Sequence, residues 1–171
     1  MSTPTPRLIF LRGNSGSGKT TVAARLQQVR PHGSLLRLGQ DAVRRDMLRV
    51  RDTEGNAAVD WLRRLTLMGL EEGRSVVVEG ILHSERYGHL LLELQAHHSG
   101  PTLAYRWDIP WEETLRRHAT KPNAGDFGAE AMGEWWRDSD PVPGLGERVI
   151  GPLESLEATV ARIVGDCGWD S

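Results

Sequence analysis

The residues best suited to chemistry lie near the start of the chain, where glycine, lysine and hydroxyl side chains are closely spaced. Residues 8–11 form an apolar run long enough for one buried strand. Residues 13–20 then fit the spacing G-x-x-x-x-G-K-[ST], in which glycines let successive backbone N–H groups turn toward an anion. The spacing predicts a phosphate-binding loop. The residues expected to contact a nucleotide are Gly13, Asn14, Ser15, Gly16, Ser17, Gly18, Lys19, Thr20 and Thr21.

Two side chains at the end of this loop have distinct predicted roles. Lys19 places a positive charge near the β- and γ-phosphates, and the Thr20 hydroxyl can bind Mg²⁺. The helix that follows directs its positive end at the same anion. A chance match in a glycine-rich loop is the alternative, but a strand before the loop and a helix after it favour phosphate binding.

A second pair of functional side chains follows the second predicted strand, residues 34–38. Asp41 and Arg44 are one helical turn apart at the start of a helix that we expect to end near residue 50. Phosphoryl transfer to an alcohol needs a carboxylate to orient the hydroxyl and accept its proton, and it benefits from a nearby cation. Asp41 suits the first role and Arg44 the second. Asp41 could be only a helix N-cap, but its position beyond a strand and beside a phosphate loop favours catalysis.

The rest of the chain alternates strands with helices. Strands are predicted at residues 8–11, 34–38, 75–78, 102–109 and 148–150. Helices are predicted after the phosphate loop and near residues 41–50, 58–72, 85–98, 110–120, 127–138 and 153–163. This order predicts an α/β fold with a parallel sheet covered on both faces. Because ligands bind beyond the carboxyl ends of such strands, residues 13–20, 39–45, 79–84 and 108–111 should gather at one edge.

Composition narrows the class of protein. A length of 171 residues is enough for one domain with a core, and charged residues make up 26% with a net charge of −2. No basic excess indicates a nucleic-acid partner, and no apolar run approaches the roughly 18 residues of a membrane span. The single cysteine, Cys167, excludes an internal disulfide and is typical of a reducing compartment. We therefore expect a cytoplasmic protein.

A phosphate loop followed by Asp-x-x-Arg after the second strand resembles the small P-loop kinases, which include polynucleotide 5′-kinase, the chloramphenicol phosphotransferases and zeta-toxin-like kinases. The resemblance covers residues 8–163 on the nucleotide side and is weak on the acceptor side. It implies a three-layer P-loop NTPase fold with five parallel strands in the order 2-3-1-4-5. It also implies that Asp41 is the general base and that Arg44 contacts substrate or phosphate, with Arg45 as the alternative.

The segment from residue 108 to 118 resembles the approach to the lid of these kinases, where an arginine reaches over the phosphates. The resemblance implies a lid near residues 116–128 of a single domain. Arg116 and Arg117 are the candidates for this arginine, with Lys121 in reserve. A solvated helix face is the alternative interpretation of the two arginines.

Two further segments match the family pattern in part. Glu79, which follows the third predicted strand, resembles a second acidic motif and could hold Mg²⁺, contact the acceptor or only cap a turn. These kinases usually carry aspartate there, and glutamate extends the reach by one methylene. Gly151 and Pro152, between the last strand and the last helix, resemble the loop that borders the adenine base.

The acceptor side offers individual candidates without a motif, namely His83, Arg86, Trp61, Trp135 and Trp136. Trp61 and Trp135 lie on apolar helical stripes, which predicts that they belong to the core. Trp136 lies off its stripe and is the favoured stacking residue.

The favoured function is a kinase that uses ATP and Mg²⁺ to phosphorylate a hydroxyl group of a nucleoside, sugar or antibiotic. A kinase acting on the 5′ end of a nucleic acid is the second interpretation, which the net charge weakens. A nucleotide-binding switch is the third, because residues 52–55 fit D-x-x-G. No apolar strand precedes these residues, and the sequence lacks an Asn-Lys-x-Asp guanine motif.

Overall fold

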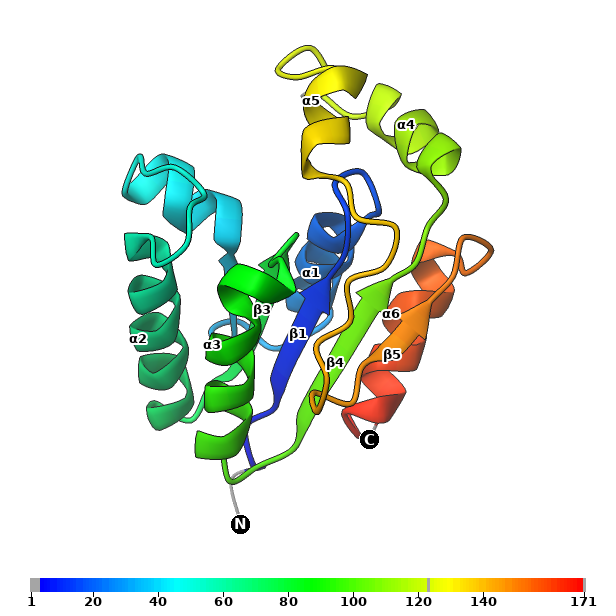
Figure 1. Cartoon of the computed structure of the whole chain (residues 1–171). Helices are drawn as coiled ribbons and strands as arrows, with labels where there is room; N and C mark the ends of the chain where they lie inside the picture. Colours follow the sequence, from blue (N-terminus) through cyan, green and yellow to red (C-terminus); the bar gives the residue numbers. More distant parts are fainter. Residues whose placement is uncertain (1–3, 123, 171) are drawn as a thin grey trace.

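The computed structural model describes residues 4–122 and 124–170, and its centre is a parallel sheet of five strands (Figure 1). The strands are β1 (Leu8–Arg12), β2 (Leu35–Gly39), β3 (Ser75–Gly80), β4 (Thr102–Trp107) and β5 (Arg148–Ile150). They pair in the order β2-β3-β1-β4-β5, and every pairing is parallel. The predicted fold class and strand order are confirmed.

The helices are α1 (Lys19–Gln28), α2 (Ala57–Glu71), α3 (Ser84–His97), α4 (Trp111–Ala119), α5 (Ala129–Trp135) and α6 (Leu156–Asp166). The helix expected near residues 41–50 is a short π-helical turn, η1 (Ala42–Met47), in which Leu48 N–H donates to Val43 O over five residues. The last helix begins at Leu156 rather than near residue 153, so Leu153 lies outside it, 98% exposed. Among the described residues, no helix is long and apolar enough to cross a membrane.

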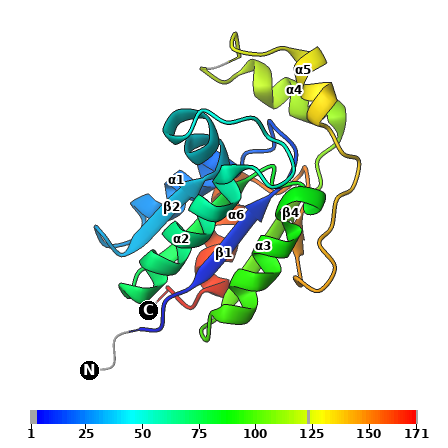
Figure 2. The ribbon, with the colours of Figure 1, turned by 60° about the vertical axis from the view of Figure 1, so that its left-hand side comes forward.

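Helices cover both faces of the sheet, which explains why the first four residues of β1 are all apolar instead of alternating (Figure 2). Leu8 and Phe10 point into a core closed by α2 and α3. Ile9 and Leu11 point into a second core closed by α1 and α6. The carboxyl ends of the strands therefore meet at one edge, over which α4 and α5 lie (Figure 1).

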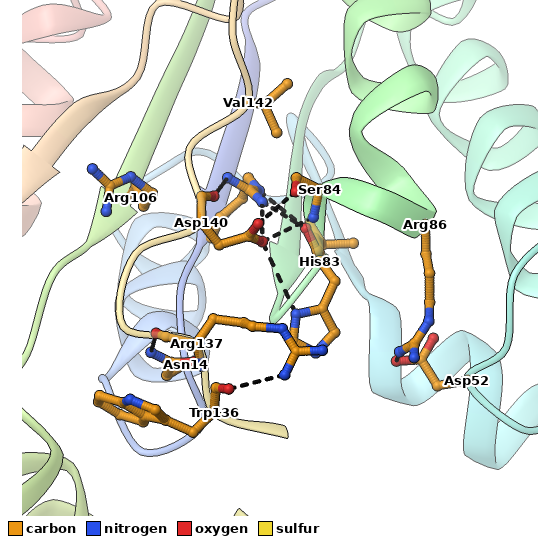
Figure 3. Close-up of polar contacts among 12 residues, drawn as sticks. Asn14, Asp52, His83, Ser84, Arg86, Arg106, Trp136, Arg137, Asp140 and Val142 are labelled. Atoms are coloured by element: carbon orange, nitrogen blue, oxygen red, sulfur yellow. Dashed lines mark hydrogen bonds and ion pairs between the residues drawn. The ribbon is translucent and has the colours of Figure 1, made fainter. Parts of the chain in front are cut away.

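A buried arginine, Arg12, attaches the chain that returns from α5 to this edge of the sheet. Its guanidinium is 1% exposed, donates to Leu82 O at 3.1 and 2.8 Å, and pairs with Asp140 at 3.0 Å and with Glu147. Asp140 also accepts from Ser84 N–H at 2.8 Å, so its carboxylate joins β1, α3 and the returning chain (Figure 3).

We expect Arg12→Met to lower the free energy of unfolding by about 3–5 kcal/mol, because it removes the cation of the partly buried Asp140 and leaves the buried Glu147 with only Arg106, at 3.8 Å. Urea unfolding would measure this. The matched control is Arg64→Met, because Arg64 is 77% exposed and pairs with Asp60 on the surface of α2. Its removal should cost about 0–1 kcal/mol. Equal losses in the two variants would contradict the anchoring role of Arg12.

Candidate active site

The phosphate loop joins β1 to α1 and folds around its own lysine. Gly16 and Gly18 have positive φ angles, and a Cβ atom at Gly16 would lie 2.7 Å from a backbone oxygen of α4. The ammonium of Lys19 donates to Asn14 O at 2.8 Å and to the Ser17 hydroxyl at 3.1 Å. Burial lowers the pKa of Lys19 to about 8. The loop therefore holds a poorly solvated cation where a phosphate group would bind.

An acid and a hydroxyl lie together beside this lysine. Thr20 Oγ1 is 3.2 Å from each carboxylate oxygen of Glu79, which ends β3 and is 7% exposed. Burial raises the pKa of Glu79, while the charge of Lys19 opposes that rise. Both oxygen donors suit Mg²⁺. Among the described residues no three His, Cys, Asp or Glu side chains gather around one metal position, so phosphate oxygens and water would complete the coordination, as is usual for Mg²⁺.

The predicted Asp-Arg pair lies at the start of η1. Asp41 Oδ1 is 3.2 Å from Arg44 Nη2 and 3.7 Å from Arg45 Nε. Arg44 is largely buried and also donates to Val50 O at 3.2 Å, whereas the Asp41 side chain is 60% exposed. The arginine is therefore fixed, and the carboxylate faces open space.

Two cavities meet at the phosphate loop. The first, of about 510 Å³, contains the catalytic candidates, and we call it the η1 cavity; its lining includes Lys19, Thr20, Asp41, Arg44, Glu79, His83, Arg86 and Trp135. The second, of about 520 Å³, lies between the loop, α4 and the start of α6, and we call it the α6 cavity; its lining includes Thr21, Trp107, Arg117, Pro152, Leu153 and Thr159. Gly16, Gly18 and Lys121 line both cavities. The phosphate loop therefore lies between two cavities and forms part of the wall of each.

The two lid arginines differ in what they contact. Arg117 Nη1 donates to Ser17 O of the phosphate loop at 2.8 Å, and its Nη2 donates to Pro152 O at 3.1 Å. Arg116 is 68% exposed and pairs with Glu113 at 2.6 Å. The structure thus brings Arg117, and not Arg116, to the phosphate loop. Lys121, the reserve candidate, is partly buried, and burial lowers its pKa.

A side chain of the loop also holds the chain that follows α5. Asn14 Nδ2 donates to Arg137 O at 2.6 Å, and Arg137 N–H donates to Asn14 Oδ1 at 2.9 Å (Figure 3). The sequence analysis missed this pair and the Arg12 cluster. The only local signal for this pair was the asparagine itself, because its amide can donate to the C=O and accept from the N–H of the same residue.

The aromatic candidates are placed differently from the prediction. Trp135 is half-buried in the wall of the η1 cavity, with Arg45 5.7 Å from its ring. Trp136, which was favoured for stacking, packs edge-to-face on Trp111 at 5.0 Å. The prediction was wrong because α5 ends at Trp135, so helical spacing does not extend to the next residue. Trp61, expected in the core, is 44% exposed on α2.

Two other acceptor candidates, His83 and Arg86, line the η1 cavity. His83 is 5% exposed, and burial lowers its pKa, so the imidazole is neutral at neutral pH. Arg86 pairs at 3.2 Å with Asp52, the first residue of the D-x-x-G match. Asp52 is therefore engaged by side chains of α3 and lies in the wall of the cavity.

The fold and the site together define a class. A phosphate loop between β1 and α1, a carboxylate–arginine pair after β2 and an acid at the end of β3, all on a β2-β3-β1-β4-β5 sheet, characterise the small P-loop kinase fold. Residues 8–139 match the model of a family described as an AAA domain, and the chain belongs to this family. The resemblance found in the sequence is thereby confirmed.

Solved structures agree with this class. The fold is similar to a protein from Chloroflexus aurantiacus that is assigned as a kinase (19% identity, TM-score 0.72, covering 99% of this chain and 100% of that one). It is similar to a sugar kinase from Janibacter sp. (17% identity, TM-score 0.67, covering 95% of this chain and 94% of that one). It is also similar to the APS kinase CysC of Mycobacterium tuberculosis (20% identity, TM-score 0.65, covering 98% of this chain and 99% of that one). At these identities the likeness concerns the fold alone. No curated protein sequence matches the chain significantly.

We expect the affinity for ATP to fall by about tenfold between pH 7 and pH 9, because Lys19 loses its proton over that range. The terminal phosphate, whose second pKa is about 6, is fully charged throughout. Binding should also take up protons near pH 8, since the phosphates favour charged Lys19. Titration calorimetry in two buffers of different ionisation enthalpy measures both effects. Affinity independent of pH, without proton uptake, would contradict this role of Lys19.

Proposed function

We propose that the protein is a kinase that transfers the γ-phosphate of ATP to a hydroxyl group of a small molecule. The observation that carries this proposal is the arrangement of the two cavities on either side of the phosphate loop. A nucleotide in the α6 cavity would direct its phosphates past Lys19 toward Asp41 in the η1 cavity. A hydroxyl compound in the η1 cavity would then lie between the general base and the phosphate.

The nucleotide side is supported by the lining of the α6 cavity. Leu153 is an exposed apolar side chain beside Pro152, which suits the flat face of a nucleobase. Thr20 and Glu79 would hold Mg²⁺, which neutralises charge on the phosphate oxygens when it is bound. Backbone N–H groups of residues 13–21 would bind the same oxygens.

On the acceptor side, the proposed reaction gives a role to Asp41, Arg44 and Arg117. The acceptor oxygen attacks the γ-phosphorus, the bond from that phosphorus to the β,γ-bridging oxygen breaks, and Asp41 takes the hydroxyl proton. The products are ADP and a phosphate ester. Arg44 orients the carboxylate of Asp41 through the contact at 3.2 Å. Arg117, which already contacts the phosphate loop, is the lid arginine that would stabilise charge on the transferred phosphoryl group.

The chain would form one domain, in which residues 116–128, from the last turns of α4 to the start of α5, act as a lid. Arg117 connects this segment to the phosphate loop through Ser17 O, and beyond α5 the Asn14–Arg137 pair makes a second connection. Movement of the lid would therefore change the contacts of the phosphate loop.

The 5′-hydroxyl of a nucleic acid is the second candidate acceptor. The arginines of the η1 cavity favour it, and the fold is similar to part of the Pnkp1/Rnl/Hen1 RNA repair complex (15% identity, TM-score 0.57, covering 85% of this chain and 51% of that one). The net charge of −2 favours a small molecule. ATP consumption with nucleosides, sugars, antibiotics and 5′-hydroxyl oligonucleotides separates the two.

We expect Asp41→Asn to lower kcat by about 10²–10⁴-fold while the affinity for ATP is kept, because the amide cannot accept the hydroxyl proton. Coupled ADP release and equilibrium binding measure the two quantities. Asp46→Asn is the matched control, because Asp46 is an exposed carboxylate of the same turn. A kcat that Asp41→Asn leaves unchanged would remove the general base from the proposal.

The two lid arginines should respond differently to substitution. Arg117→Gln removes the guanidinium that contacts the phosphate loop, and kcat should fall by at least about 10²-fold. Arg116→Gln should stay near the parental rate, because Arg116 is exposed and paired with Glu113. Steady-state kinetics of both variants test this difference. The reverse result would assign the lid role to Arg116.

A further inference from the structure

The η1 cavity has an excess of positively charged side chains in its wall. Six cationic side chains line the cavity as a whole, against four carboxylates, although the chain carries a net charge of −2. Lys19 and Glu79 belong to the phosphate position. Four of the other cationic side chains are arginines from η1, the segment after it and α3. They are Arg44, Arg45, Arg51 and Arg86.

Arg86 is held in place by a chain of polar contacts that leads into the core. Its Nη1 is 3.2 Å from Asp52 Oδ2, and Tyr87 donates to the other oxygen of that carboxylate at 2.7 Å (Figure 3 shows Arg86 and Asp52). The Tyr87 hydroxyl in turn accepts from Gln40 at 2.9 Å and from Asn56 at 3.3 Å. Burial raises the pKa of Tyr87 to about 12, so its hydroxyl stays a donor at neutral pH. The guanidinium is thus oriented before any ligand binds.

Arg44 is also held by hydrogen bonds, and part of its guanidinium has no hydrogen-bond partner among the described residues. Two of its nitrogens donate to Val50 O and Asp41 Oδ1, both at 3.2 Å. Its Nε is buried, and within residues 4–122 and 124–170 it has no hydrogen-bond partner. Because Nε is shielded, a ligand in the cavity would meet the terminal nitrogens. Each of these carries two N–H groups and uses one in the contacts above, so the guanidinium can still donate to a ligand oxygen.

We propose that the hydroxyl acceptor also carries an anionic group, and that Arg86 and Arg44 bind this group. The proposal rests on the kinase function proposed above and names the chemical class of its acceptor as a hydroxyl compound with a phosphate, sulfate or carboxylate group. Two oriented guanidinium groups match the planar or tetrahedral oxygens of such an anion. A neutral acceptor would leave the excess positive charge of the wall uncompensated. Arg86 is accordingly a specificity-determining residue.

The first test uses inorganic sulfate with the phosphate loop already filled. Protein saturated with the ATP analogue AMPPNP and Mg²⁺ is titrated with sulfate in a calorimeter. We expect saturable binding that Arg86→Gln weakens by about tenfold or more, because a charge-assisted contact is lost. Arg86→Lys should retain part of the affinity, since lysine keeps the positive charge but lacks the planar guanidinium with its paired N–H donors. Arg64→Gln, on the exposed face of α2, should bind sulfate as the parent does.

The AMPPNP affinity of each variant shows that it is folded and that its nucleotide site is intact. Undetectable sulfate binding would overturn the anion subsite. So would equal binding by the parent and Arg86→Gln, which would indicate an adventitious ion only.

The second test compares neutral acceptors with related anionic ones. ATP turnover is measured with glucose, gluconate and glucose 6-phosphate, and with uridine and uridine 5′-monophosphate. We expect the anionic members to have the higher kcat/KM, and Arg86→Gln to reduce that preference by about tenfold or more. Transfer to neutral members at equal or higher kcat/KM would overturn the anion subsite and leave the kinase function standing. Absent transfer with Arg86-dependent sulfate binding would instead contradict the kinase function and support the subsite.

Discussion

The buried ammonium of Lys19 is the group on which the arrangement of this molecule depends. Burial lowers its pKa, and the charge of the nearby buried Glu79 opposes that shift. Each group is costly to bury alone, and together they stabilise one another. Their proximity requires β1 and β3 to be neighbours, because Lys19 follows one strand and Glu79 ends the other. The central position of β1 in the sheet is thus linked to the chemistry at its end.

The same edge of the sheet connects α4 and α5 to the phosphate loop. Both helices lie over the loop (Figure 1), where Gly16 closely approaches the backbone of α4 and Arg117 donates to Ser17 O. The chain after α5 is held by the Asn14–Arg137 pair and, further on, by buried Arg12. The region proposed as a lid is thus coupled both to the phosphate loop and to the end of β1.

The sequence predicted those features that depend on neighbouring residues. The apolar run of β1 and the glycine spacing after it predicted a buried strand and the phosphate loop, and the alternation of elements predicted the parallel sheet. Asp41 and Glu79 were found because they lie just past or at the end of a strand, where the topology places ligands. Their catalytic and metal-binding roles stay predictions.

The features that the sequence did not predict depend on contacts between residues distant in the chain. Arg12 meets Asp140, and Tyr87 meets Asp52, and no local spacing indicates either pair. The helix after β2 was predicted, but its π-helical hydrogen bonding was not, because helical periodicity does not separate one-residue differences in a short turn. The choice between Trp135 and Trp136 failed for a related reason, since it depended on the residue at which α5 ends.

Net charge gives an incomplete view of this protein. A value of −2 argues against a large polyanionic partner, because binding of that kind needs basic residues over an extended surface. It does not describe a cavity, in which a few oriented groups decide what binds. The arginines of the η1 cavity come from three separate segments, so their concentration is a product of the fold. A small acceptor with one anionic group satisfies both observations, because it needs a local excess of positive charge and no basic surface around it.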